Sequence, residues 1–386
     1  MEMMLMKMNK RSHNTSIVLS LLLALLLFSC SQEQENNDFF DLTSMPAVSV
    51  EGELIDEYLM AYKSNQMKFI QSKLFHFEPT EQEVCLVTTE ENDTVGYFSG
   101  IGGGPGEMLQ PYFCGISEKQ DTIYMYDNTY KKLFIFHLQI TEKGEIDYTL
   151  IENKSQINTD RLQYNGHKMP QMYFHLTRLE NGYYIAYRVL TKEDIFTLLD
   201  KDLNEIANFG EYPIDKGLFS ESEELRTTTY FAGAMAADGN SFYFGSHHFG
   251  YLYRYDISDQ GELTKVWQKQ FMKPQYFMKG NKVKFNSASL EAFYDLVIGK
   301  EYIYATFSGI ENGELFRTKN HDALTPKTLV ILDKQGNVKG KFDLGKQIRT
   351  LCLDEKEEYL YVHHKEPDTS LWRYKISDFT KYWDEN

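Results

Sequence analysis

The chain has 386 residues, with 40 Lys and Arg against 56 Asp and Glu, and its formal net charge is −16. This acidic balance argues against nucleic acid as a partner, because phosphate binding requires cationic side chains. The four cysteines are isolated and show neither a CxxC pair nor another metal-ligand spacing. We therefore predict no disulfide framework, no metal site and no cofactor, and we expect Cys85, Cys114 and Cys352 to be buried free thiols.

Residues 1–29 have the pattern of a bacterial signal peptide. Three basic residues precede an apolar run at 17–28, which is too short to span a bilayer as a stable helix. The run ends in Leu-Phe-Ser-Cys at 27–30, which resembles a lipobox with small Ser29 at the cleavage site. We predict removal of residues 1–29 and lipid attachment at Cys30; an ordinary secretory peptide with a chance cysteine is the alternative.

Residues 30–44 are expected to form a flexible tether, since 31–38 are all polar. Without residues 1–29 the formal charge becomes −18, which disfavours docking of the body onto anionic lipid. The membrane is thus an expected partner only through the lipid anchor. Ser31 stands where inner-membrane lipoproteins carry Asp, and Glu33 and Glu35 resemble the acidic tethers of surface lipoproteins. We expect an outer-membrane lipoprotein, either displayed on the cell surface or facing the periplasm.

A short tyrosine-containing run recurs along the rest of the chain. Aromatic residues make up 15% of the sequence, a composition that favours pleated strands. The aligned tyrosines, which are 60, 59, 61 and 57 residues apart, are Tyr124, Tyr184, Tyr243, Tyr304 and Tyr361. A weaker sixth copy occupies residues 57–60, 64 residues before Tyr124 when counted from Met60.

A second apolar run follows each copy, and several of these runs end in Asp and a polar turn. The second runs are residues 73–77, 132–136, 195–199, 251–255, 329–332 and 371–374. A third strand follows at 205–209 and again at 338–342. Short strands separated by Gly, Asn and Asp turns are typical of antiparallel hairpins.

Six such units predict an all-β fold: a six-bladed β-propeller of four-stranded antiparallel blades over residues 45–386. Few residues follow Tyr361, so the outer strand of the last blade is expected to come from the N-terminal segment, near residues 47–50. Such closure would fasten the ring and cover free strand edges. A tandem of β-sandwiches is the alternative, although the regular repeat fits it poorly.

Residues 100–107 read Gly-Ile-Gly-Gly-Gly-Pro-Gly-Glu and precede the strand of Tyr124. This combination resembles the TolB-like six-bladed propeller lipoproteins of Bacteroides-type bacteria, whose first blade commonly ends in a G-x-G-x-G-P-G-E stretch. Gly103 stands where family members often carry a basic or polar residue. The resemblance covers roughly residues 45–386 and implies a lipid-anchored propeller in the cell envelope; it implies no catalytic residues.

The glycine segment itself favours a structural role. Gly102, Gly104 and Gly106 permit positive φ or close backbone approach, and Pro105 stiffens the segment. A phosphate site is disfavoured, because the segment lacks the Gly-Lys-Ser/Thr of a P-loop. We expect an inter-blade turn in which Glu107 accepts backbone N–H bonds rather than acting as an acid.

Four of the ten histidines form two pairs, 247–248 and 363–364, near the ends of aligned strands. Adjacent strand residues point to opposite faces, so at most one member of each pair can face a common site. We select His248 and His364 as candidate ligand-binding residues, with structural or turn roles as the alternative. A metal would need further ligands that the sequence does not single out.

No catalytic constellation is recognisable: there is no G-x-S-x-G elbow, no H-E-x-x-H and no nucleotide fingerprint. We therefore expect a binding or scaffold module for a protein, peptide or glycan of the cell envelope rather than an enzyme. The alternative is a hydrolase or lyase that acts on a sugar or lactone at the channel mouth, by fold analogy alone. Three or more clustered carboxylate or His side chains at one channel end would favour the enzyme, and a broad aromatic face would favour binding.

Overall fold

In a computed structural model, the chain forms two units, residues 1–38 and residues 39–386. The structure describes residues 38–57, 66–77, 83–141, 144–155, 161–164, 167–170, 172–189, 194–211, 232–279, 282–365 and 369–383. The predicted signal peptide and Cys30 lie outside this set, and so does most of the run at 57–60. Among the residues described, no helix is long and apolar enough to span a membrane.

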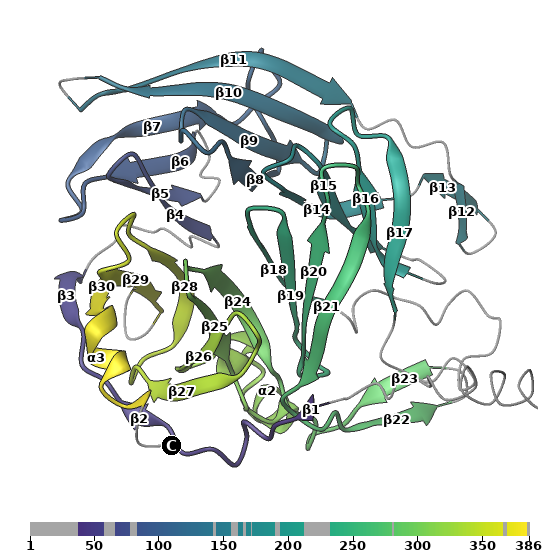
Figure 1. Cartoon of the computed structure of the whole chain (residues 1–386), viewed down its shortest axis with the longest axis vertical. Coiled ribbons are helices and arrows are strands. Elements are labelled where there is room, and N and C mark those ends of the chain that lie inside the picture. Colours follow the sequence, from purple (N-terminus) through teal and green to yellow (C-terminus); the bar gives the residue numbers. More distant parts are fainter. Residues whose placement is uncertain are drawn as a thin grey trace, which may run out of the picture. The chain divides into compact units, whose positions relative to one another are not determined.

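Residues 39–386 form the predicted all-β propeller, with six four-stranded antiparallel blades (Figure 1). The blades are numbered here in chain order, and each is given from its innermost strand outward. Blade 1 contains β4 (Gln66–Ile70), β5 (Lys73–Phe77), β6 (Glu83–Thr88) and β7 (Thr94–Gly100). Blade 2 contains β8 (Pro111–Ile116), β9 (Thr122–Asp127), β10 (Lys132–Ile140) and β11 (Ile146–Ser155). Blade 3 contains β14 (Met172–Arg178), β15 (Tyr184–Val189), β16 (Asp194–Leu199) and β17 (Glu205–Glu211).

The second half of the ring repeats this arrangement. Blade 4 contains β18 (Gly233–Asp238), β19 (Ser241–Ser246), β20 (Tyr251–Ile257) and β21 (Leu263–Gln270). Blade 5 contains β24 (Phe293–Ile298), β25 (Tyr302–Phe307), β26 (Thr328–Asp333) and β27 (Val338–Asp343). Blade 6 contains β28 (Ile348–Leu353), β29 (Tyr359–His364), β30 (Ser370–Lys375) and β3 (Glu53–Asp56). Strand β28 packs beside β4, so the last blade adjoins the first.

The five aligned tyrosines all lie on second strands, namely β9, β15, β19, β25 and β29. Blade 1 departs from the predicted alignment. Its run at 73–77 is the second strand β5, not the third, and β4 precedes it at 66–70. Phe75 is the residue on β5 that corresponds to the aligned tyrosine. Blade 1 has no tyrosine there, and this absence shifted the sequence alignment by one strand.

The same five-residue turn joins the third and fourth strands in five blades. Its first residue is Thr, Asp or Ser, whose side-chain oxygen accepts the N–H of the fifth residue, as Asp333 does from Asn337 at 2.8 Å. The fourth residue has positive φ and is Gly in three turns, including Gly336 (φ 75°). These turns occupy residues 89–93, 141–145, 200–204, 258–262 and 333–337. The Asp-plus-polar-turn pattern of the sequence is therefore a capped turn between hairpin strands.

The N-terminal segment closes the ring as predicted, but through a later strand. The outer strand of blade 6 is β3 at 53–56, whereas β2 (Val48–Ser49) adds in parallel to the edge of β27 in blade 5. Gly52 allows the chain to pass the ring of Tyr374, because a Cβ there would lie 2.6 Å from a ring carbon. The guanidinium of Arg373 then binds the carboxylate of Glu53 at 2.7 and 2.9 Å.

Residues 39–44, which the sequence assigned to the tether, already belong to the ring. Leu42 is fully buried in the core between blades 4 and 5. The N–H groups of Phe40 and Leu42 donate to the carbonyls of Gln270 and Phe271 at the edge of blade 4. The packed body thus begins before residue 45, because Leu42 is buried in the core. The polar composition of residues 31–38 gave no indication of this burial.

Aromatic side chains fill the interfaces between blades. Phe196 of blade 3 packs edge-on against Phe242 and Phe244 of blade 4, with ring centroids 5.1 and 4.9 Å apart. Such edge-to-face contacts supplement the burial of apolar area, which is the dominant stabilising term. The cysteines Cys85, Cys114 and Cys352 are buried free thiols, as predicted. Burial raises the pKa of each of these thiols, so they are not reactive at neutral pH.

Blade topology gives the ring two different faces. The term loop face is used here for the face at which each innermost strand begins and each second strand ends. The opposite face is called the turn face. The loop-face connections include the described residues 101–110, 128–131, 247–250, 271–279, 282–292, 308–327 and 344–347. They carry helix α2 (Asn312–Thr318), the 3-10 helix η4 (His321–Leu324) and the hairpin of β22 (Tyr276–Lys279) and β23 (Lys282–Phe285). A further hairpin, β12 (Arg161–Tyr164) with β13 (His167–Pro170), connects β11 to β14 in the chain and is drawn at the outside of the ring beside β17 (Figure 1).

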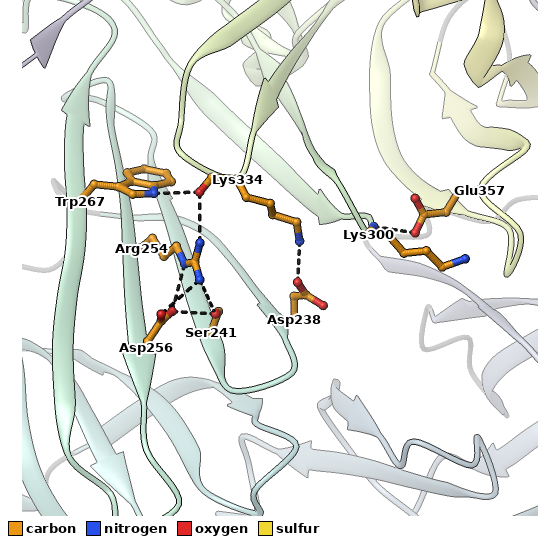
Figure 2. A network of polar contacts seen from close by, with 8 residues as sticks. All are labelled: Asp238, Ser241, Arg254, Asp256, Trp267, Lys300, Lys334 and Glu357. Carbon is orange, nitrogen blue, oxygen red and sulfur yellow. Dashed lines mark hydrogen bonds and ion pairs between the residues drawn. The ribbon is translucent and has the colours of Figure 1, made fainter.

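The turn-face connections between strands that the structure describes are short turns, and polar contacts hold several of these across blades. The carbonyl of Lys334 in blade 5 accepts bonds from Trp267 Nε1 and Arg254 Nη1 of blade 4, at 3.0 and 3.2 Å (Figure 2). Lys334 Nζ lies 2.5 Å from a carboxylate oxygen of Asp238. Helix α3 (Ile376–Thr380) follows β30 on this side and packs Phe379 against Phe342. The turn face is therefore a braced scaffold, and the long connections between described strands lie on the loop face.

Candidate ligand-binding face

Exposed aromatic side chains distinguish the loop face from the turn face. Tyr130, Phe277 and Phe316 lie in loop-face connections and are more than a third exposed, and Phe316 on α2 reaches 61%. Leu109 in the glycine segment is exposed as well. The other exposed large apolar residues lie on outer strands or at the N-terminal edge, and the described turn-face connections contain none. Among the described connections between strands, exposed large apolar side chains therefore occur on the loop face alone, and exposed apolar surface of this kind is typical of interaction sites.

Uncharged rings gather where the innermost strands begin. Tyr112 on β8 meets His175 on β14 edge-on at 4.7 Å, and His247 stacks on Tyr294 of β24 at 4.7 Å between centroids. Burial lowers the pKa of His175 to about 4 and that of His247 to about 3, where the neighbouring imidazoles of His248 and His175 add to the effect. Both imidazoles are therefore neutral at physiological pH and act as aromatic, hydrogen-bonding rings.

His248 pairs with a buried carboxylate on this face. Its Nδ1 lies 3.0 Å from Oε1 of Glu291, a side chain that is only 2% exposed. The imidazole of His248 is 21% exposed and stacks on Phe285 at the base of the β22–β23 hairpin, with centroids 4.8 Å apart. A carboxylate at Nδ1 favours the tautomer with the proton on that nitrogen, which leaves the Nε2 lone pair available as an acceptor.

The other predicted ligand residue, His364, lies elsewhere. It is fully buried within blade 6, where Nε2 contacts the hydroxyl of Tyr374 at 2.8 Å and Nδ1 contacts the carbonyl of Gln347 at 3.3 Å. Both ring nitrogens are thus used inside the blade, and the side chain does not reach the ligand-facing surface expected from the sequence. Blade 5 separates it from His248, and the contacts of the two residues do not overlap.

The partner of His364 in the sequence, His363, points the other way, into the seam between blades 6 and 1. Its ring stacks on His76 of β5 with centroids 4.9 Å apart, and its Nε2 lies 3.1 Å from Nδ1 of His76. The Nε2 of His76 contacts the hydroxyl of Thr88 at 2.9 Å. Both rings are fully buried, and burial lowers the pKa of each. This pair is a structural joint rather than a surface site.

The glycine segment connects blades 1 and 2 on the loop face. Oε2 of Glu107 accepts the N–H of Gly104 at 2.7 Å, and a Cβ at Gly104 would lie 3.0 Å from the Glu107 carboxyl group. Gly106 has a φ of 80°, which disfavours other residues there. The backbone closes on itself, with the N–H of Gly102 donating to the carbonyl of Met108. With its carboxylate committed to this turn, Glu107 stabilises the loop that presents Leu109.

Sequence reasoning missed Glu291, His175 and Tyr294. Glu291 stands two residues before β24, and the other two lie on innermost strands. Two innermost strands, β14 and β24, carry a register irregularity at these positions, between Tyr173 and Leu176 and between Phe293 and Leu296. A bulge of this kind re-aims side chains and cannot be seen in the strand period of the sequence.

Within the described ranges, no group of three or more His, Cys, Asp or Glu side chains is arranged to hold a metal ion. Three imidazoles are neighbours here, those of His175, His247 and His248. Glu291 supplies the carboxylate in this group through its contact with His248. Of these three rings, His248 has a side chain that is 21% exposed, so it is the one through which this arrangement could accept a hydrogen bond from a ligand. This oriented imidazole also has the geometry of a proton acceptor.

No family model matches the chain, and no curated protein matches it in sequence. Solved structures with the same fold do exist. One is a putative exported protein from Bacteroides fragilis, with 10% identity and a TM-score of 0.53, and the match covers 87% of this chain and 98% of that one. Another is a member of the DUF4221 family from Bacteroides vulgatus, with 14% identity, a TM-score of 0.53, and coverage of 83% and 94%. At this identity the likeness is one of fold.

Proposed function

We propose that this protein is a cell-envelope lipoprotein whose propeller binds a protein, peptide or glycan on its loop face. One observation carries the proposal: exposed aromatic residues lie in the loop-face connections, while the described turn-face connections have none. Aromatic rings supply much of the binding energy of interfaces and also stack on sugar rings. The turn face, braced by the contacts around Lys334, provides the rigid support that such a surface needs.

Site-specific photocrosslinking in intact cells tests the location of this surface. A benzophenone amino acid is placed at Tyr130, Phe277 or Phe316 on the loop face, with Tyr97 and Tyr148 on the outer strands as matched exposed controls. We expect covalent adducts from the loop-face positions and none from the controls. Equal yields from both sets, or adducts from the outer strands alone, would contradict the proposal.

Lipidation at Cys30 and membership of the TolB-like propeller lipoproteins are part of the same proposal. The lipobox at 27–30 supports the anchor, and the six blades with the glycine segment support the family. Metabolic labelling with a radioactive fatty acid checks the anchor: the full-length protein should be labelled, and the Cys30→Ser variant should not. Protease shaving of intact cells distinguishes surface display from a periplasmic position, since only a displayed ring is cleaved without lysis.

The His248–Glu291 pair favours a second candidate, a hydrolase or lyase that acts on a sugar or lactone. In such an enzyme His248 Nε2 would take a proton from water or a substrate hydroxyl, and Glu291 would stabilise the imidazolium. The test is turnover of a panel of lactones and aryl glycosides by the purified protein. This candidate predicts turnover that is lost in His248→Gln and reduced about tenfold or more in Glu291→Gln, while the exposed-site variant His137→Gln keeps it.

A further inference from the structure

The N-terminal segment follows the outer rim of the ring from blade 4 to blade 6. β1 (Asp38–Phe39) lies along the edge of β21, β2 along β27, and β3 completes blade 6 (Figure 1). Lys341 Nζ fixes the segment by donating to the carbonyls of Leu42 and Met45, at 2.9 and 3.2 Å. The packed body therefore starts at one defined place, the rim of blade 4.

Two aromatic side chains are exposed at this starting point. Phe39 and Phe40 are 41% and 44% exposed, whereas Leu42 in the same segment is fully buried. Lys273, which follows β21, holds its Nζ 5.2 Å from the ring centroid of Phe39. We call Phe39, Phe40 and Lys273 the rim patch. Its backbone is held by the bonds of Phe40 and Leu42 to blade 4, so the patch is presented on a rigid support.

We propose that the rim patch contacts the bilayer surface that holds the lipid of Cys30, and this inference rests on the proposed lipidation. Only nine residues lead from Cys30 to Phe39, a span of at most about 30 Å when fully extended. The anchor thus keeps the patch close to the headgroups, where even weak affinity is effective.

The chemistry of the patch fits a membrane interface. Phenylalanine rings bury into the headgroup and acyl boundary, and lysine extends its charge to the headgroups from a buried stem. The body carries a strong negative charge, so the contact is with zwitterionic rather than anionic lipid. Lys273 belongs to the loop-face connection that follows β21, so the patch lies at the loop-face end of the blade 4 rim, and attachment there leaves the turn face of the ring free.

A fluorescence experiment on the lipidated protein in phosphatidylcholine and phosphatidylethanolamine vesicles tests this contact. The environment-sensitive NBD dye is attached to a cysteine at Phe39→Cys or Phe40→Cys, with Tyr97→Cys and Ile206→Cys on the outer strands of blades 1 and 3 as controls. The buried thiols Cys85, Cys114 and Cys352 do not compete for the label. We expect blue-shifted emission and quenching by doxyl lipids at positions 39 and 40, and neither effect at the controls.

Each result decides one point. Lipidated protein without quenching at positions 39 and 40, or with equal quenching at positions 97 and 206, would overturn the rim contact and leave the anchor intact. A blue shift that grows with protein density and resists doxyl lipids would overturn it in favour of a contact between two copies. Fatty-acid labelling of the same preparation tests the anchor separately, so the two proposals fail in distinguishable ways.

Discussion

His76 and His363 meet across the seam where the first and last blades close the ring, with Nδ1 of one 3.1 Å from Nε2 of the other. The contact joins residues 287 positions apart and buries two imidazoles completely. Ring closure therefore depends on a neutral hydrogen bond as well as on the strand β3. Each of these features has a consequence that can be measured.

We expect acid to destabilise the protein between about pH 6.5 and pH 4. Burial lowers the pKa of His76 to about 4, whereas a histidine in an unfolded chain titrates near 6.5. The unfolded state therefore binds a proton that the folded state excludes, so the stability contribution is complete above about pH 6.5 and is lost as the pH falls toward 4. The loss is on the order of 3 kcal/mol for this residue.

Urea unfolding at a series of pH values measures this loss. The variant His76→Gln should be less stable at pH 7 but should show a shallower fall in unfolding free energy below pH 6.5. His137→Gln, on the exposed side of β10, serves as the control and should keep the wild-type slope. If the unfolding free energy of wild type and of His76→Gln fell equally with pH, the buried His76–His363 contact would not be what excludes the proton.

Removal of β3 should open the ring. A chain that begins at residue 47 loses β1 and Leu42 but keeps the outer strand of blade 6, whereas one that begins at 58 leaves the edge of β30 uncovered. We expect the first to unfold cooperatively at a lower temperature. We expect the second to aggregate or unfold without a sharp transition, because exposed edges promote association. Calorimetry and light scattering check this, and an unchanged transition in the shorter chain would contradict it.

Loss of the Glu107 carboxylate should loosen the glycine segment. The substitution Glu107→Ala removes the acceptor of the Gly104 N–H and should cost about 1–2 kcal/mol in the free energy of unfolding. Glu107→Gln keeps a side-chain oxygen and should recover most of that loss. Glu145→Ala, at an exposed turn, is the control and should change little. Chemical denaturation compares the three, and equal stability of the Ala and Gln variants would assign no role to this bond.

The His248–Glu291 contact predicts a defined tautomer. The Glu291 carboxylate accepts the proton of Nδ1, so neutral His248 should be protonated at Nδ1 and unprotonated at Nε2. Nitrogen chemical shifts of selectively labelled histidine report this directly. In Glu291→Leu the preference should weaken toward the Nε2-protonated tautomer that free imidazole favours. A wild-type His248 protonated at Nε2 would exclude it as the proton acceptor of the proposed hydrolase or lyase.

Several features were predictable because they depend on neighbouring residues. Local patterns of apolar and turn-forming residues predict the hairpins and the turns between them, such as 333–337. They also predict the repeat of the blades, which is marked by aligned tyrosines such as Tyr243. The position of the closing strand was harder to predict. Residues 48–49 and 53–56 are both short extended runs, and the contacts that seat 53–56 in blade 6, Gly52 against Tyr374 and Glu53 with Arg373, exist only in the folded ring.

The histidines show the same division. Their pairing in the sequence correctly indicated that adjacent members face opposite ways, as His363 and His364 do. It could not show which of them would be buried, since that depends on which blade packs alongside. His248 is oriented by Glu291, which lies 43 residues later, just before the first strand of the next blade.

The sequence by itself determined the repeat, the all-β ring of six blades and the motif for a lipid anchor, because strand period, turn chemistry and the lipobox are local in the chain. Only the tertiary structure decided that Tyr130, Phe277 and Phe316 share the loop face, that Phe39 and Phe40 stand at the rim, and that His248 meets a buried carboxylate. The physical reason is that a propeller brings together residues from different blades, and contacts across blades leave no periodic signal in the sequence.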